Sequence, residues 1–125
     1  MEDLKAFFFD TYALYEMIHE SENYKKYQKG VSVITTKLNL MELHYIVLRN
    51  YGLEKANEAF DFFLKFCIEI DDDVIKEANE FKLKNYRREL SYVDCVGYVL
   101  AKRYNAKFLT GDRQFEDFEN VEFVK

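Results

Sequence analysis

LSYVDCVGYVLAKRYNAKFLTGDRQFEDF, residues 90–118, combines a helix, a strand and two acidic residues in one short unit. The apolar and small residues of its first half predict a helix over 89–105, and the apolar run over 107–110 is typical of a buried strand. Asp94 falls near the start of the helix, and Asp112 comes directly after the strand. Carboxylates at the two ends of one helix–strand unit indicate a functional site.

The rest of the chain repeats this alternation of short apolar strands and helices. Strands are expected over 6–9, 31–35, 67–70, 107–110 and 121–124, and helices over 12–20, 21–30, 36–51, 53–66, 71–85 and 89–105. Such alternation is typical of an α/β fold, with a mainly parallel sheet and helices on both faces. The helix over 36–51 has one apolar stripe of Leu38, Met41, Tyr45 and Leu48. We expect the aromatic residues of the 36–51 and 53–66 helices to be mostly core. The alternative is that surplus ones such as Tyr45, Tyr51, Phe60 and Phe62 form an apolar surface for a segment of a partner protein or a second copy.

Composition narrows the classes of protein that this chain can belong to. With 125 residues, 49% of them hydrophobic, it is expected to form a single domain over 1–125. The net charge of −5 provides no general attraction for nucleic acid, although metal ions can neutralise a carboxylate cluster. Cys67 and Cys95 lie inside apolar runs and predict buried, reduced thiols. No early apolar run is long enough for a signal peptide or membrane span, so we expect a soluble, cytoplasmic protein without membrane contact.

Four acidic residues fall at positions where an α/β fold binds ligands. Asp10 follows the first strand and Asp112 follows the strand over 107–110, and ligands bind outside the carboxyl ends of parallel strands. Glu42 has mostly apolar helical neighbours, and Asp94 lies among apolar and small ones. A buried carboxylate is costly unless a cation compensates it.

Each acid also has a purely structural interpretation. Asp10 fits an N-cap, and Asp94 fits a capping box with Ser91. Asp112 fits an Asx turn, and Glu42 could pair with a lysine or arginine. Taken singly, these interpretations compete well with a functional one. They do not explain why all four carboxylates fall at strand ends or helix starts.

The chain resembles the PIN domain family, and more narrowly the small toxin ribonucleases of VapBC toxin–antitoxin pairs. The matching motifs are Phe8-Phe9-Asp10-Thr11, Asn39-Leu40-Met41-Glu42, Tyr92-Val93-Asp94-Cys95-Val96 and Phe108-Leu109-Thr110-Gly111-Asp112-Arg113-Gln114-Phe115. The resemblance implies a three-layer α/β/α sandwich around a short, mainly parallel five-stranded sheet in the order 3-2-1-4-5. Two departures stand out: many relatives have Ser where this chain has Tyr12, and an acid where it has Gln114. The second departure leaves the capacity for a second metal ion open.

The resemblance also implies a chemistry. It makes the chain a metal-dependent endoribonuclease with Asp10, Glu42, Asp94 and Asp112 as catalytic metal ligands, and hard carboxylate oxygens without His or Cys favour Mg²⁺ or Mn²⁺. Its partners would be an RNA substrate, a cognate antitoxin and a second copy in a homodimer. Candidate water-orienting residues are Thr11 and Thr110, and candidate RNA-binding residues are Lys82, Lys84, Arg87, Arg88 and Arg113.

Two other classes of function, a binding module and a phosphatase, share some of these sequence features. One alternative is a catalytically weak or inactive PIN-like module that binds protein or RNA. The presence of all four acids argues against it. An aspartyl-phosphate phosphatase would need a second Asp where Tyr12 stands, so this class is disfavoured.

Overall fold

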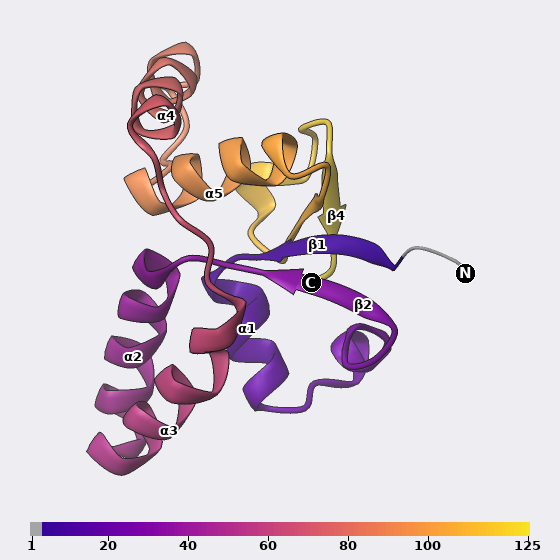
Figure 1. Cartoon of the computed structure of the whole chain (residues 1–125), viewed down its shortest axis with the longest axis vertical. Coiled ribbons are helices and arrows are strands. Elements are labelled where there is room, and N and C mark those ends of the chain that lie inside the picture. The colour runs from indigo at the N-terminus through magenta and orange to yellow at the C-terminus, as the bar shows by residue number, and fades with distance from the viewer. Residues whose placement is uncertain (1–3) are drawn as a thin grey trace.

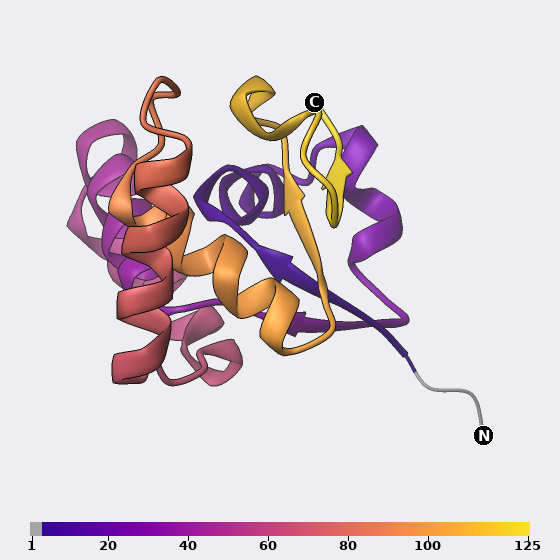
Figure 2. The same ribbon diagram turned by 90° about the horizontal axis from the view of Figure 1, so that it is seen from above.

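The computed structural model describes residues 4–125 and contains one four-stranded sheet. The strands are β1 (Lys5–Phe9), β2 (Val31–Ile34), β3 (Lys107–Thr110) and β4 (Val121–Phe123). They lie in the order β2-β1-β3-β4, and every neighbouring pair is parallel. Figure 2 views the sheet from the side of α5, with β4 (yellow) at one edge.

Helices cover both faces of this sheet. They are α1 (Thr11–Ile18), α2 (Lys37–Tyr51), α3 (Leu53–Phe63), α4 (Asp72–Lys84) and α5 (Tyr92–Arg103), with 3₁₀ turns η1 (Glu22–Tyr27), η2 (Leu64–Phe66) and η3 (Arg113–Phe115). Figure 1 shows α1, α2 and α3 on one side of the strands and α4 and α5 on the other. The three-layer α/β/α architecture is thus confirmed.

Alternating strand residues explain the two covered faces. Successive side chains of a strand point to opposite sides, so Phe7 and Phe9 join a core with α1, α2 and α3, whereas Phe8 joins the core with α4 and α5. On β3, Leu109 and Phe108 divide in the same way. The central residues of both strands are therefore apolar, because neither of their faces meets water, whereas Lys5 and Lys107 at the strand starts are exposed.

The prediction of a strand over 67–70 is wrong. It is reduced to a single bridge, in which Cys67 pairs in parallel with Thr35 beside β2. Two hydrogen bonds hold it, from Thr35 N–H to the Phe66 carbonyl and from Ile68 N–H to the Thr35 carbonyl. Pairing stops there because Thr36 already caps α2 and Asp71 caps α4. Otherwise the order of the segments agrees with 3-2-1-4-5.

The apolar stripe of Leu38, Met41, Tyr45 and Leu48 does not provide the buried face of α2. The buried apolar residues are Leu40, Leu43 and Val47, whereas Met41 and Tyr45 are 59% and 61% exposed. Helix α2 has two apolar stripes, and packing against α3 and the sheet uses only one. Tyr51 and Phe62 are also exposed, so the expectation that such aromatics are mostly core is wrong for them.

Two smaller observations complete the fold. Cys95 is buried and Cys67 is half-buried, and both are free thiols. No helix within residues 4–125 has the length and apolar character needed to cross a membrane.

Candidate functional site

The four predicted acids come from four different elements at the carboxyl edge of the sheet. Asp10 follows β1 and caps α1, and Asp112 follows β3 and caps η3. Because Phe9 pairs with Leu109, the residues after β1 and β3 leave the sheet side by side. Glu42 lies on α2, and Asp94 lies in the first turn of α5.

Effects on their pKa values indicate that these carboxylates lie near one another. Burial raises the pKa of Asp10 from 3.8 to about 8, and the charges of Asp94 and Asp112 contribute to the increase. Burial also raises the pKa of Asp94, with contributions from Asp112 and Glu42. Within residues 4–125, none of the four forms an ion pair with a lysine or arginine. The cluster therefore has no compensating cationic side chain among the described residues.

The caps considered from the sequence are present as well. Asp10 Oδ1 accepts a hydrogen bond from Ala13 N–H at 2.8 Å, and Asp112 Oδ1 accepts one from Gln114 N–H at 2.9 Å. Asp94 and Ser91 form a reciprocal capping box, with both hydrogen bonds at 3.0 Å. A carboxylate has two oxygens, so each cap fixes one oxygen without excluding a role for the other.

Threonine hydroxyls support two of the acids. Thr11 Oγ1 donates to Glu42 Oε1 at 2.6 Å and accepts from Asn39 Nδ2 at 3.2 Å. Thr110 Oγ1 accepts the Asp112 N–H at 3.0 Å, and its hydrogen bond to Asp10 opposes the rise in the pKa of that carboxyl. The predicted role of both threonines in orienting water stays a prediction.

Asn39 is the residue at this site whose role sequence reasoning missed. It lies one helical turn before Glu42, which is a usable signal, and it is buried. No sequence pattern connects it with Thr11, which is 28 positions away. Only the packing of α1 against α2 brings these two side chains together.

A shallow depression of about 550 Å³ opens beside Glu42. Thr11, Met41, Tyr45 and Ile46 complete its lining. Of the four acids, Glu42 alone lines this depression, so solvent reaches Glu42 from the side of α2.

The residues fit a hard divalent cation in their chemistry. All donors are carboxylate or hydroxyl oxygens, the type that Mg²⁺ and Mn²⁺ prefer. Within residues 4–125, no three acidic, His or Cys side chains stand close enough to hold a metal ion in their present rotamers. Mutual repulsion of carboxylates keeps such groups apart when no cation lies between them.

Some of the predicted RNA-binding side chains are bound to other protein groups, and others are exposed to solvent. The Arg88 guanidinium forms two hydrogen bonds to Asp117, at 2.8 and 2.9 Å, donates to the Gln114 carbonyl and lies over the Phe118 ring. Arg113, next to Asp112, has a side chain that is 69% exposed. Lys82 donates to the Leu90 carbonyl and lies near the Tyr92 ring, whereas Lys84 and Arg87 are exposed. Contact with RNA stays a prediction for all five.

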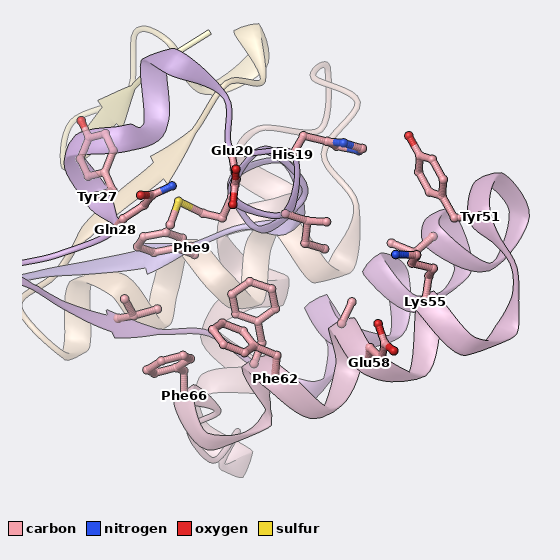
Figure 3. Close-up of a pocket in the computed structure, with 16 residues that line it drawn as sticks. Phe9, His19, Glu20, Tyr27, Gln28, Tyr51, Lys55, Glu58, Phe62 and Phe66 are labelled. Atoms are coloured by element: carbon pink, nitrogen blue, oxygen red, sulfur yellow. The ribbon is translucent and has the colours of Figure 1, made fainter.

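A second hollow lies away from the four acids. It has a volume of about 740 Å³ between α1, η1, β2 and α3, and none of the four acids lines it. Figure 3 shows Phe62 and Phe66 along one side of this hollow and Lys55, Glu58 and Tyr51 along another. We call this hollow the α3 pocket.

Comparison with known proteins identifies the family. The model of the PIN domain family matches residues 7–121. The chain belongs to the PIN domain family. The resemblance seen in the four sequence motifs is thereby confirmed.

Solved structures agree with the fold of this PIN domain. The toxin VapC20 of Mycobacterium tuberculosis, which cleaves the sarcin-ricin loop, is 19% identical with a TM-score of 0.80, over 95% of this chain and 99% of that one. VapBC2 of Rickettsia felis, bound to a promoter DNA fragment, is 18% identical with a TM-score of 0.72, over 96% and 99%. A toxin–antitoxin complex of Klebsiella pneumoniae is 15% identical with a TM-score of 0.72, over 92% and 94%. Among curated proteins, none matches this sequence.

Proposed function

We propose that this PIN domain is a metal-dependent endoribonuclease that hydrolyses RNA phosphodiester bonds. The observation that carries the proposal is the convergence of Asp10, Glu42, Asp94 and Asp112, without a compensating cation, at the carboxyl edge of a parallel sheet. Clustered carboxylates without a cation destabilise a protein, and such costly groups are typical of functional sites. Membership of the PIN domain family supports a nuclease, and VapC20, which shares the fold, cleaves RNA of the sarcin-ricin loop.

The four acids would hold Mg²⁺ or Mn²⁺. When bound, such a cation lowers the pKa of an attacking water and stabilises negative charge on the scissile phosphate. Backbone N–H and hydroxyl groups each hold one oxygen of an acid, so the second oxygen of each carboxylate would be the one that a cation uses.

Positive charge for the RNA would come from exposed side chains beside the acids. Arg113 follows Asp112 directly and has a largely exposed guanidinium. Lys84 and Arg87, at the end of α4 and beyond it, add charge near Tyr86, which is 67% exposed. Arginine and lysine bind phosphates, and an exposed tyrosine can stack on an unpaired base.

We further infer that the protein is the toxin of a VapBC-type pair, with an antitoxin and a second copy as partners. Toxin–antitoxin complexes among the proteins of similar fold support the antitoxin. The α3 pocket offers an apolar interior with a charged rim, as suits an apolar segment of the antitoxin that carries charged flanks. The exposed stripe of Met41, Tyr45 and Leu48 on α2 suits contact with a second copy.

RNA cleavage tests the proposal. Wild type is incubated with a structured RNA in Mg²⁺ or Mn²⁺ and compared with Asp94→Asn, which keeps an oxygen to accept the Ser91 N–H. We expect the variant to cleave at least about 100-fold more slowly, the scale for removal of a group that stabilises transition-state charge. Asp61→Asn, an exposed acid on α3, is the charge-matched control. Equal cleavage by wild type and Asp94→Asn would disprove the site, and no cleavage by wild type would favour a PIN-like binding module.

A further inference from the structure

Asn39 is a polar residue buried in the first turn of α2, and all its side-chain atoms that can form hydrogen bonds have partners. Only 2% of its surface is exposed. Its Oδ1 is 2.6 Å from Thr36 Oγ1, and its Nδ2 is 3.2 Å from Thr11 Oγ1. Its backbone N–H points to Thr36 Oγ1 at 3.2 Å. A buried amide whose oxygen and nitrogen each have a partner is held in one orientation.

The partners determine which end of the amide faces which threonine. Thr36 Oγ1 accepts the backbone N–H of Asn39, so its single proton is free for another acceptor. The separation of 2.6 Å is typical of an O–H···O bond and is shorter than the usual N–H···O range, so the neighbouring atom of the Asn39 side chain is the acceptor, Oδ1, and not the donor, Nδ2. The Nδ2 group consequently faces Thr11, and the chemistry of the partners fixes this orientation.

The same reasoning extends to Glu42. Nδ2 is a donor only, so Thr11 Oγ1 accepts from it. The single Thr11 proton is then left for Glu42 Oε1, which lies 2.6 Å away. Hydrogen bonds thus run in one direction, from Thr36 through Asn39 and Thr11 to Glu42. We call this chain the Asn39 relay.

We infer that Asn39 is a positioning residue, which directs the Thr11 hydroxyl onto Glu42 Oε1 and so presents the ionised carboxylate with Oε2 available to a divalent cation. Within residues 4–125, Oε2 accepts no hydrogen bond. Only the consequence for the cation rests on the proposed function, because the direction of the relay follows from the protein groups alone. Supporting groups around metal ligands typically change metal affinity by about 10–100-fold.

The relay is tested by substitutions that each remove or keep a single hydrogen bond of the wild-type protein. Asn39→Asp keeps an acceptor for Thr36 but replaces the donor that faces Thr11, so the Thr11 proton is drawn away from Glu42. Thr11→Val removes the hydroxyl at nearly constant shape and buries no new charge. Thr11→Ser keeps the hydroxyl and is the matched control.

Mn²⁺ binding is measured by calorimetry, together with KM and kcat for RNA cleavage. We expect Asn39→Asp and Thr11→Val each to weaken Mn²⁺ binding about tenfold and to lower kcat with little change in KM. Thr11→Ser keeps the hydroxyl and should bind Mn²⁺ more tightly than Thr11→Val. Asp61→Asn, an exposed acid on α3, should stay within about twofold of wild type. The loss in Asn39→Asp is diagnostic, because an added negative charge would by itself attract Mn²⁺. The double variant should be no weaker than Thr11→Val alone, since both act through one chain of hydrogen bonds. Unchanged binding in Thr11→Val, or additive losses in the double variant, would overturn the relay.

A second readout separates the relay from the proposed function. In the metal-free protein, the side-chain amide resonances of Asn39 should shift in Thr11→Val and stay in place in Thr11→Ser. If wild type binds no Mn²⁺, the proposed function fails while these resonances still decide the relay. If they are the same in wild type and Thr11→Val, the Thr11–Asn39 hydrogen bond is absent and the relay is disproved.

Discussion

The ring of Tyr12 lies directly on the backbone of Gly111. A Cβ atom at position 111 would stand 2.1 Å from Cε1 of the ring, which is much closer than atoms can approach. Gly111 does not have a left-handed backbone conformation, so the close approach and not the φ angle requires glycine here. Tyr12, which stands where many relatives have Ser, is thus accommodated by Gly111 between Thr110 and Asp112.

A double-mutant cycle tests this contact. Gly111→Ala should destabilise the protein by about 1–3 kcal/mol, because the added methyl group displaces the Tyr12 ring. The same substitution made together with Tyr12→Ser should cost little, since the ring is absent. Urea unfolding of wild type, the two single variants and the double variant gives the coupling free energy between positions 12 and 111. An equal cost of Gly111→Ala with and without Tyr12→Ser would contradict the contact.

Asp10 makes the stability of the metal-free protein depend on pH. Its pKa is raised to about 8 in the folded state, so the folded protein binds a proton that the unfolded chain releases near pH 4. The resulting stabilisation is complete below pH 3.8 and is lost as the pH rises through about 8. Each unit of the pKa difference corresponds to about 1.4 kcal/mol. Asp10→Asn keeps a capping oxygen and should raise Tm at pH 8 to 9 in EDTA but not near pH 4. A fall in Tm at pH 8 would show that capping is the dominant role of Asp10.

Divalent cations should stabilise the protein at neutral pH. Binding to the folded state alone raises stability by mass action, about 2.7 kcal/mol at a cation concentration 100 times Kd. We expect Mn²⁺ to raise the Tm of wild type, and to raise it much less in Asp10→Asn or Asp94→Asn. KCl at the same ionic strength is the control for screening. A Tm increase of the same size in Asp61→Asn and Asp94→Asn would place the cation elsewhere.

Arg88 and Lys84 should respond differently to substitution, although both were predicted to bind RNA. Arg88 holds Asp117 with two hydrogen bonds and donates to the Gln114 carbonyl, so it fixes the segment that follows Asp112. Lysine cannot reproduce this planar arrangement, and Arg88→Lys should lower Tm. Lys84→Gln should leave Tm unchanged and instead reduce the salt dependence of RNA binding. A reduced salt dependence with unchanged Tm in Arg88→Lys would favour phosphate binding by Arg88.

Two apolar surfaces predict two separable interactions. Phe62→Lys places a charge in the α3 pocket and should prevent complex formation with the protein encoded by the neighbouring gene, while the oligomeric state stays that of wild type. Tyr45→Lys places a charge on the exposed stripe of α2 and should convert a dimer to a monomer without loss of that complex. Co-purification and light scattering measure the two outcomes. Loss of both interactions in either variant, with Tm unchanged, would show a single shared surface.

The order and type of the elements follow closely from local sequence. Strand β3 has the predicted bounds, and Asp10, Thr36, Asp71 and Ser91 cap helices as such residues commonly do. These features depend on neighbours within a few positions, so a single sequence is sufficient to predict them. The prediction of a strand over 67–70 was wrong because the pairing of this segment depends on how many residues are left between two helix caps.

For the candidate site, too, some features follow from the sequence and others only from the tertiary structure. The four acids stand in recognisable motifs, and the sequence alone determined their identity and their order. The choice of Mg²⁺ or Mn²⁺ stays a prediction. Tertiary structure decided which apolar stripe of α2 is buried, that Tyr12 lies on Gly111, and that Asn39 reaches Glu42 through Thr11. Motifs and caps arise from chemistry between close neighbours in the chain. The other contacts join residues far apart in sequence, whose meeting depends on how helices pack against one sheet.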